Sequence, residues 1–252
     1  MTNYEIILTE DGSPSLRFIS SENQEIMHHS GGAWAETWYI YGQPMQKIFE
    51  LSKSQAGLQK ISIASIGLGL GYNELLAARM AYENSSNQSL KVNLRSYEKD
   101  AYLTESFIDY IRGKTLSSLE MQQVYDKILS FVAGDKAKEV RKILMAMHVR
   151  GDWKILGPLE KELKKENYFN VILYDAFSSK TSPELWSEEF LTQFLKHEAD
   201  DNCVLTTYAC KGSLKRALKQ NQFEYIERPG FMGKRNSSFA FRGFNLNRSQ
   251  AG

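Results

Sequence analysis

The chain opens with two short stretches in which apolar and polar positions are mixed as in strands, residues 4–8 (YEIIL) and 15–19 (SLRFI). The segment between them contains an Asp-Gly pair and a proline, which is typical of a tight turn. We therefore expect an N-terminal β-hairpin. A helical or mixed segment follows from about residue 33 and ends in the polar stretch around Gly57.

From residue 61 the pattern changes to buried runs that alternate with amphipathic helical periods, which is typical of a parallel sheet covered on both faces. The expected strands are residues 61–67, 91–97, 147–152, 169–177 and 202–208, closed by an antiparallel pair at 223–228 and 237–244. The expected helices are residues 72–83, 102–112, 117–131, 156–165, 182–198 (with Ser182 as cap and Pro183 in first position) and 214–221.

These elements predict an α/β, Rossmann-like fold with a seven-stranded, doubly wound sheet and an N-terminal β-hairpin extension. The connection between the second and third strands is much longer than a usual βα connection. We expect a helical insertion there, at about 99–146. The predicted organisation is an extension over 1–57 that packs on a main domain over 58–252.

Composition narrows the class of protein without naming a ligand. The chain has 252 residues, 42% of them hydrophobic, and 31 Lys and Arg against 30 Asp and Glu. Disordered, collagenous and disulfide-scaffold classes are excluded. Because the first residues resemble no secretion signal and no apolar run approaches the ~18 residues of a membrane span, we expect a cytoplasmic protein. The two cysteines and four histidines lack metal-ligand spacing, so no metal is predicted.

Candidate chemistry begins at the glycine-rich turn after the first long strand, IGLGLGYNE. Gly67, Gly69 and Gly71 form G-x-G-x-G, whereas the usual nicotinamide turn is G-x-G-x-x-G. The observed spacing is more typical of turns that hold S-adenosylmethionine, although a purely structural turn is the alternative. Leu68 and Asn73 complete the predicted cofactor-binding segment.

Acidic residues follow at the ends of the next strands, where ligands bind in open α/β sheets. Glu98 could accept both hydroxyls of a ribose, and Asp152, after Gly151, could accept the amine of an adenine. Asp175 ends a strongly apolar strand, which places it near the transferring group. For each of these acids, a helix cap or a solvated strand end is the structural alternative, but their conjunction favours an adenosyl cofactor.

Charge is segregated along the chain. The last fifty residues, 203–252, carry nine basic groups and two acidic groups, a net +7 in a chain whose total is +1. Phenylalanines interleave with these charges, which suits RNA binding, although alternate phenylalanines in a strand are more often core.

Together, these motifs resemble the methyltransferase domain of the bacterial tRNA 5-methylaminomethyl-2-thiouridine biosynthesis protein. The resemblance covers residues 61–236 and weaker similarity precedes it. The segments that carry it are IGLGLGYNELL, Tyr97-Glu98-Lys99, Gly151-Asp152, DAFSSKTSPELW, TTYACKGSLKRAL and RPGFMGKR. The chain departs from the family's pattern in Ser-Ser-Lys after Phe177 and in Asn236, where the family has Glu.

The resemblance implies a class I methyltransferase that uses S-adenosyl-L-methionine to methylate the 5-aminomethyl group of the wobble uridine in tRNA. Asp175 then maps to the catalytic position and also contacts the cofactor. Family members often continue into a flavin-dependent oxidoreductase domain, and we expect a stand-alone methyltransferase here. The predicted substrate-binding residues are Phe177, Lys211, Lys234 and Arg235.

Two other functions stay open. An aminopropyltransferase of the spermidine-synthase type shares the sheet, but would be expected to carry two or more acids after the fourth strand. A non-catalytic RNA-binding module would explain the basic C-terminal segment but not the cofactor positions. No oligomeric state is predicted.

Overall fold

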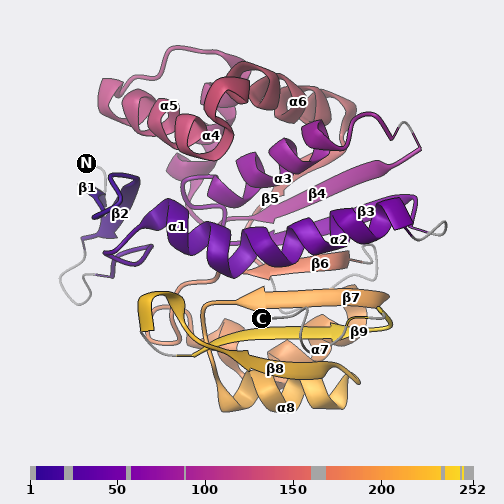
Figure 1. Cartoon of the computed structure of the whole chain (residues 1–252). Helices are drawn as coiled ribbons and strands as arrows, with labels where there is room; N and C mark the ends of the chain where they lie inside the picture. The colour runs from indigo at the N-terminus through magenta and orange to yellow at the C-terminus, as the bar shows by residue number, and fades with distance from the viewer. Residues whose placement is uncertain are drawn as a thin grey trace.

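A seven-stranded sheet forms the centre of the molecule in the computed structural model, which describes residues 4–19, 25–54, 58–87, 89–159, 169–233, 236–244 and 246. The strand order is β5-β4-β3-β6-β7-β9-β8, with only β9 antiparallel to its neighbours (Figure 1). This confirms the predicted doubly wound, Rossmann-like sheet. The strands are β3 (Lys60–Ile66), β4 (Lys91–Tyr97), β5 (Trp153–Leu156), β6 (Phe169–Tyr174), β7 (Ala199–Thr207), β8 (Glu224–Arg228) and β9 (Ser237–Arg242).

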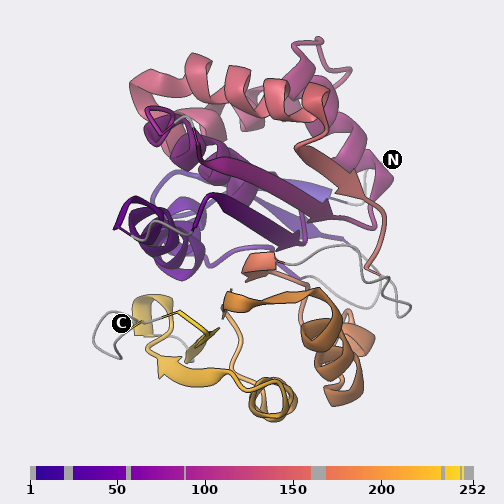
Figure 2. The same cartoon turned by 90° about the vertical axis from the view of Figure 1, so that its right-hand side faces the viewer.

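Alternate side chains of each central strand enter two hydrophobic clusters on opposite faces of the sheet. In β3, Ile61 and Ile63 belong to one cluster, and Ala64 and Ile66 to the other. Figures 1 and 2 show α7 and α8 on the opposite side of the molecule from α4, α5 and α6. The first face is covered by α1 (Ala33–Thr37), α2 (Gln43–Ser54), α3 (Tyr72–Glu83), α4 (Ala101–Arg112), α5 (Leu119–Ala133) and α6 (Ala137–Arg150), and the second by α7 (Glu188–Glu198) and α8 (Gly212–Gln220).

The N-terminal hairpin is present, with β1 (Tyr4–Leu8) antiparallel to β2 (Pro14–Phe18). Two tyrosine hydroxyls attach it to the rest of the domain. Tyr4 donates to the Asp100 carboxylate at 2.8 Å, and Tyr72 donates to the Pro14 carbonyl at 2.8 Å.

A π-helical turn, Trp38–Gly42, joins α1 to α2. Such turns disturb the regular backbone bonding of a helix. Here the Ile40 carbonyl accepts a hydrogen bond from the Thr206 hydroxyl of β7 at 2.6 Å. The segment before the main sheet is thus bonded directly to a central strand.

The structure corrects the third predicted strand. Residues 147–150 form the end of α6, and β5 begins only at Trp153. The reason is visible in the spacing of Val140, Leu144 and Met147, which are all buried and continue one helical face. Gly151 ends this helix in a left-handed conformation, with φ +78°. The region between β4 and β5 therefore holds three helices, one more than expected.

The helix predicted at 182–198 begins later than expected. Residues 183–186 form a short 3₁₀ turn, and Ser182 makes no side-chain cap. The α-helix begins after Ser187, whose hydroxyl accepts from the Phe190 N–H at 3.2 Å. Most of the helix predicted at 156–165 lies outside the described residues.

Candidate active site

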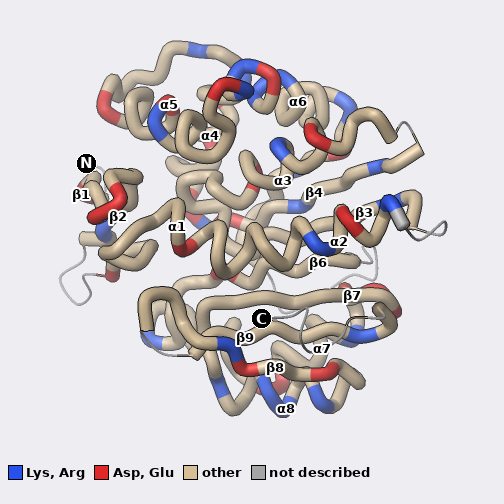
Figure 3. Tube along the Cα trace, viewed as in Figure 1, with Lys and Arg blue, Asp and Glu red and all other residues tan. Residues whose placement is uncertain are grey.

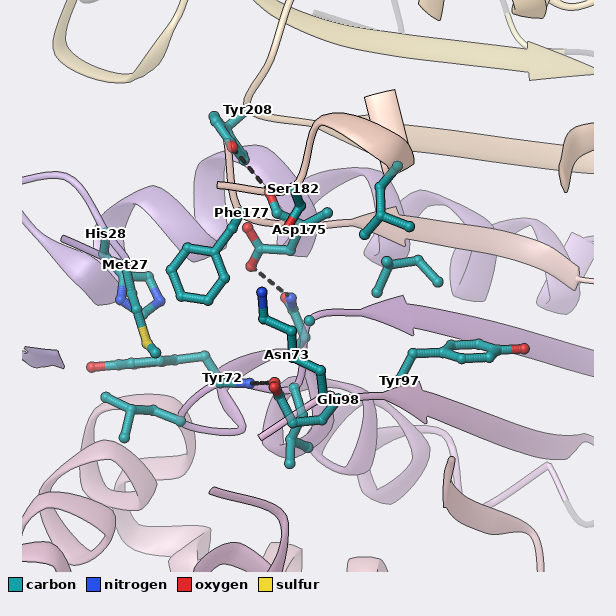
Figure 4. A pocket seen from close by; sticks show the side chains of 18 of the residues that line it. Met27, His28, Tyr72, Asn73, Tyr97, Glu98, Asp175, Phe177, Ser182 and Tyr208 are labelled. Atoms are coloured by element: carbon teal, nitrogen blue, oxygen red, sulfur yellow. Dashed lines mark hydrogen bonds between the residues drawn. The ribbon is translucent and has the colours of Figure 1, made fainter. Parts of the chain in front are cut away.

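A cavity of about 240 Å³ lies where β3, β4 and β6 end, at the carboxyl edge of the sheet. Its walls come from the turn after β3, from Glu98 and Lys99 after β4, and from residues 175–177 after β6. A further wall comes from the N-terminal region, residues 25–29 and 36–41. Figure 4 shows Glu98 and Asp175 at neighbouring strand ends, with Asn73 from the first turn of α3 between them and His28 and Met27 on one side.

The glycine turn is shaped by close backbone contacts. A Cβ atom on Gly67 would lie 2.5 Å from the Asp175 carbonyl oxygen, so only glycine lets the ends of β3 and β6 approach. Gly71, at φ +77°, would place a Cβ 2.2 Å from the Phe107 ring. Gly69 donates its N–H to the Glu98 carboxylate at 3.0 Å. The predicted turn and the predicted acid are therefore in direct contact.

Glu98 is held rigidly at the end of β4. One carboxylate oxygen accepts from Gly69 and the other from the Asp100 N–H at 2.8 Å. Burial raises the pKa of Glu98, and these backbone donors partly oppose that rise. Because each carboxylate oxygen has two lone pairs, the group can still accept bonds from a ligand in the cavity.

Asp175 is positioned by two side chains from other elements. The Tyr41 hydroxyl donates to one carboxylate oxygen at 2.7 Å, and the Asn73 amide donates to the other at 3.2 Å. Burial raises the pKa of Asp175 to about 6, while both hydrogen bonds favour its ionised form. Asn73 is 3% exposed, and its amide oxygen has no hydrogen-bond partner among the described residues. A buried acceptor of this kind beside a cavity suits a donor on a ligand.

The N-terminal wall was not predicted from the sequence. Glu25 accepts hydrogen bonds from the Ser178 N–H and hydroxyl, both at 3.1 Å, and from the Thr181 hydroxyl. It therefore fixes the loop after β6 against the N-terminal segment. His28 also lines the cavity, and burial lowers its pKa to about 4, so it is neutral at pH 7. No local motif marks these residues, because only the tertiary fold brings them to the strand ends.

Most of the charged side chains in the cavity wall are carboxylates. Glu25, Glu36, Glu98, Asp175 and Glu184 line it, against one lysine, Lys99. This arrangement favours a cationic ligand. Acids from other parts of the chain thus join Asp175, which alone follows the fourth predicted strand directly, and they supply the further carboxylates that an aminopropyltransferase would be expected to carry.

The structure does not bring Gly151 and Asp152 to the cavity. They lie at the start of β5, at the opposite end of that strand, and the Asp152 carboxylate pairs with Arg150 at 2.7 Å. Their assignment to the cofactor site is wrong because the expected strand is the end of a helix. The chain reaches the cavity only after β5, with Pro158 and Leu159.

Among the predicted substrate residues, Phe177 lines the cavity, with the Lys99 ammonium 5.8 Å from its ring centre. Lys211 lies outside the lining and donates to the Ser179 hydroxyl at 2.7 Å, next to the loop after β6. Lys234 and Arg235 lie outside the described residues.

Much of the basic C-terminal charge serves the fold. Lys215 pairs with Glu227 and Arg216 with Glu188, both at 2.5 Å. Arg242 donates to three backbone carbonyls. The interleaved phenylalanines that the structure places in the core are Phe239, Phe241 and Phe244. These phenylalanines therefore pack in the core and do not form a surface on which RNA bases could stack.

An acid that sequence reasoning missed lies directly beneath the site. Glu74, in the first turn of α3, is fully buried and accepts from the Ser96 hydroxyl at 2.7 Å. Ser96 in turn accepts from the Trp153 indole at 3.1 Å. Burial raises the pKa of Glu74 to about 7, and the hydrogen bonds from serine hydroxyls only partly oppose it.

In the parts of the chain that the structure describes, no group of three or more His, Cys, Asp or Glu side chains could hold a metal ion. No helix among those residues is long and apolar enough to cross a membrane.

Comparisons with known proteins agree with this geometry. A family model described as S-adenosyl-L-methionine-dependent methyltransferase matches residues 120–242. The sheet order and the strand-end cavity show a Rossmann-like fold, and the match to the methyltransferase family model covers just under half of the chain.

Individual relatives narrow the class. An uncharacterised protein of Methanocaldococcus jannaschii is 24% identical over 96% of this chain and 60% of its own length. The tRNA 5-methylaminomethyl-2-thiouridine biosynthesis bifunctional protein MnmC of Cupriavidus metallidurans is 25% identical over 94% of this chain and 33% of its own. The crystal structure of MnmC2 from Aquifex aeolicus matches 99% of this chain and 75% of that chain, with a TM-score of 0.68 and 21% identity. The chain is therefore similar to MnmC proteins over most of its own length, and it spans between a third and two thirds of the length of these two curated relatives.

Proposed function

We propose that this domain transfers a methyl group from S-adenosyl-L-methionine to the amine of a 5-aminomethyl group on the wobble uridine of tRNA. The observation that carries the proposal is Asp175, fixed by Tyr41 and Asn73 beside the glycine turn, in a cavity whose charged side chains are mainly carboxylates. The names of the MnmC relatives support tRNA as the substrate.

The residues present fit the cofactor. Glu98 offers a buried carboxylate for the ribose, and the unpaired amide oxygen of Asn73 offers an acceptor for an ammonium group. Leu159 and Tyr97 supply apolar surface for the base in place of the predicted Asp152. When bound, the cofactor supplies a methyl group on a positively charged sulfur, which is an excellent leaving group.

Catalysis by the protein is then mainly alignment and proton transfer. The neutral amine nitrogen attacks the methyl carbon, and the carbon–sulfur bond breaks with its electron pair staying on sulfur. Nitrogen gains a positive charge and loses a proton. Asp175, with a pKa of about 6, is ionised at pH 7 and can orient the amine and accept this proton directly or through water.

The test uses labelled S-adenosylmethionine with tRNA that carries or lacks the 5-aminomethyl group, followed by mapping of the labelled nucleoside. Label on the aminomethyl uridine alone is the expected result. The matched variant Asp175→Asn keeps the shape of the side chain but removes the charge, and should slow single turnover about 10²-fold or more. Transfer that ignores the aminomethyl group would refute the proposal.

The acid-lined cavity keeps the aminopropyltransferase as a second candidate. It predicts turnover of decarboxylated S-adenosylmethionine with a diamine in the absence of tRNA. A non-catalytic module would instead show no thermal shift with S-adenosylmethionine, whereas binding at 100 times Kd should add about 2.7 kcal/mol to stability.

A further inference from the structure

A second hollow of the molecule lies on the outer helices, away from the candidate active site. This groove, of about 600 Å³, is bounded by the end of α4, the middle of α5 and most of α6. Its floor includes Leu129, Met145 and Val149, and Val149 is 71% exposed. The rim carries five basic side chains and one acid, Asp126. Figure 3 shows both basic and acidic positions along this helical layer.

Most of these positive charges are not neutralised. Lys138 and Lys142 have no ion-pair partner among the described residues. Arg112 contacts the His148 ring nitrogen at 3.1 Å, and burial together with Arg112 lowers the pKa of His148, which stays neutral. Arg141 lies 4.5 Å from the centre of the Tyr110 ring and donates to the Tyr110 carbonyl. Arg150 pairs with Asp152 at 2.7 Å, so the groove keeps a net positive charge that comes mainly from Lys138, Lys142 and the two other arginines.

The sequence spacing concentrates these charges on one face. Lys138 and Lys142 are four residues apart on α6, so they are neighbours on the helix surface, and Arg141 lies beside them. Like charges at this spacing repel each other and destabilise a helix. An anion bound along the groove would reverse that penalty.

The helix α4 connects the groove to the candidate active site. It begins at Ala101, three residues after Glu98, and the Asp100 carboxylate caps it. Arg112 ends the same helix, about 17 Å farther along the axis at 1.5 Å per residue. That separation corresponds to about five stacked nucleotides of one strand, at 3.4 Å per phosphate.

We propose that this groove holds backbone phosphates of the RNA substrate near the modified nucleotide. The inference rests on the proposed function for the identity of the RNA. Lysines and arginines without an acidic partner suit phosphates, and the apolar lining of the groove offers contact area for sugars. The C-terminal segment is a weaker candidate over its described part, because Lys215, Arg216 and Arg242 are engaged in bonds within the fold.

The test replaces Lys138 and Lys142 together by glutamine and measures filter binding of tRNA carrying the 5-aminomethyl group between 50 and 200 mM salt. The matched control replaces Lys91 and Lys196, two exposed lysines outside both cavities, with the same loss of charge. If each lysine holds one phosphate, the slope of log affinity against log salt falls by about 1.5. The loss of affinity over this salt range then shrinks about eightfold, and replacement of both lysines by arginine restores it.

If the Lys138 and Lys142 variant has the same tRNA affinity and the same salt slope as the control, the proposal is overturned. An acidic protein would then be the better candidate for the ligand of this groove. The variant's affinity for S-adenosylmethionine should stay unchanged, which excludes misfolding as the cause of weaker RNA binding. The proposed function is tested separately, by methylation of tRNA by the unsubstituted protein. If the unsubstituted protein does not methylate tRNA but the two lysine replacements still lower the salt slope, the proposed function is refuted and the proposed binding surface is not.

Discussion

Replacing Glu74 by glutamine should stabilise the protein at neutral and alkaline pH. The carboxyl is fully buried below the glycine turn, and no cation lies within ion-pair distance of it among the described residues. Glutamine has the same shape and keeps an oxygen for the Ser96 hydroxyl, which donates to Glu74 at 2.7 Å. The substitution therefore removes a buried charge with little change in packing.

The size of the effect follows from the pKa. Burial raises the pKa of Glu74 from 4.5 to about 7, which corresponds to about 3 kcal/mol of unfavourable free energy for the ionised form. Because the pKa is higher in the folded state, unfolding releases a proton between these two values. The free energy of unfolding of the natural protein should therefore fall as pH rises from about 4.5 to 7, and level off above that.

Urea unfolding of both proteins at pH 5, 6, 7 and 8 measures this difference. The variant should gain stability relative to the natural protein with each step to pH 7, to a final difference of order 1 to 3 kcal/mol. Glu105→Gln, an exposed site on α4, is the matched control and should show a difference that does not change with pH. A difference for Glu74→Gln that is flat or falls with pH would refute the reasoning.

Three further results are expected. Glu98→Ala should weaken the affinity for S-adenosylmethionine by about 1 to 3 kcal/mol in calorimetry, because the ribose hydroxyls lose their acceptor, and an unchanged Kd would remove Glu98 from the cofactor site. The kcat of methyl transfer should fall as pH drops through about 6, since Asp175 becomes protonated there, and a profile that stays level to pH 5 would contradict its role as proton acceptor. Glu25→Ala should raise KM for tRNA with little change in melting temperature, because the loop at 178–181 loses its three hydrogen bonds, and unchanged steady-state kinetics would show that this loop needs no anchor.

Local sequence could predict those parts of the site whose position is set by one strand or one turn alone. The buried run before Gly67 and the apolar strand before Asp175 define their own ends, and the carboxyl ends of parallel strands meet at one edge. The contact between Gly69 and Glu98 follows from that rule. The glycine spacing also depends only on local backbone geometry, as the positive φ of all three glycines shows.

The features that the sequence did not predict correctly depend on longer-range structure. Met147 and Val149 alternate with polar residues as in a strand, although Met147 continues the buried helical face that begins at Val140. Tyr41 lies 134 residues from Asp175 in the chain, so no periodicity relates them. Glu74 breaks the rule that a carboxylate near a helix start faces water, because α3 is almost entirely buried.

The π-helical turn at Trp38–Gly42 limits how this domain could be recombined with others. Through it, the N-terminal region supplies both the Tyr41 hydroxyl on Asp175 and a carbonyl for Thr206 of the central sheet. A chimaera that joined residues 58–252 to a foreign leader would inherit the glycine turn and Glu98 with one side of the cavity missing. Deleting one residue from this turn would rotate Tyr41 by about 100° around the helix axis, away from Asp175. The extension and the sheet must therefore be exchanged as one unit.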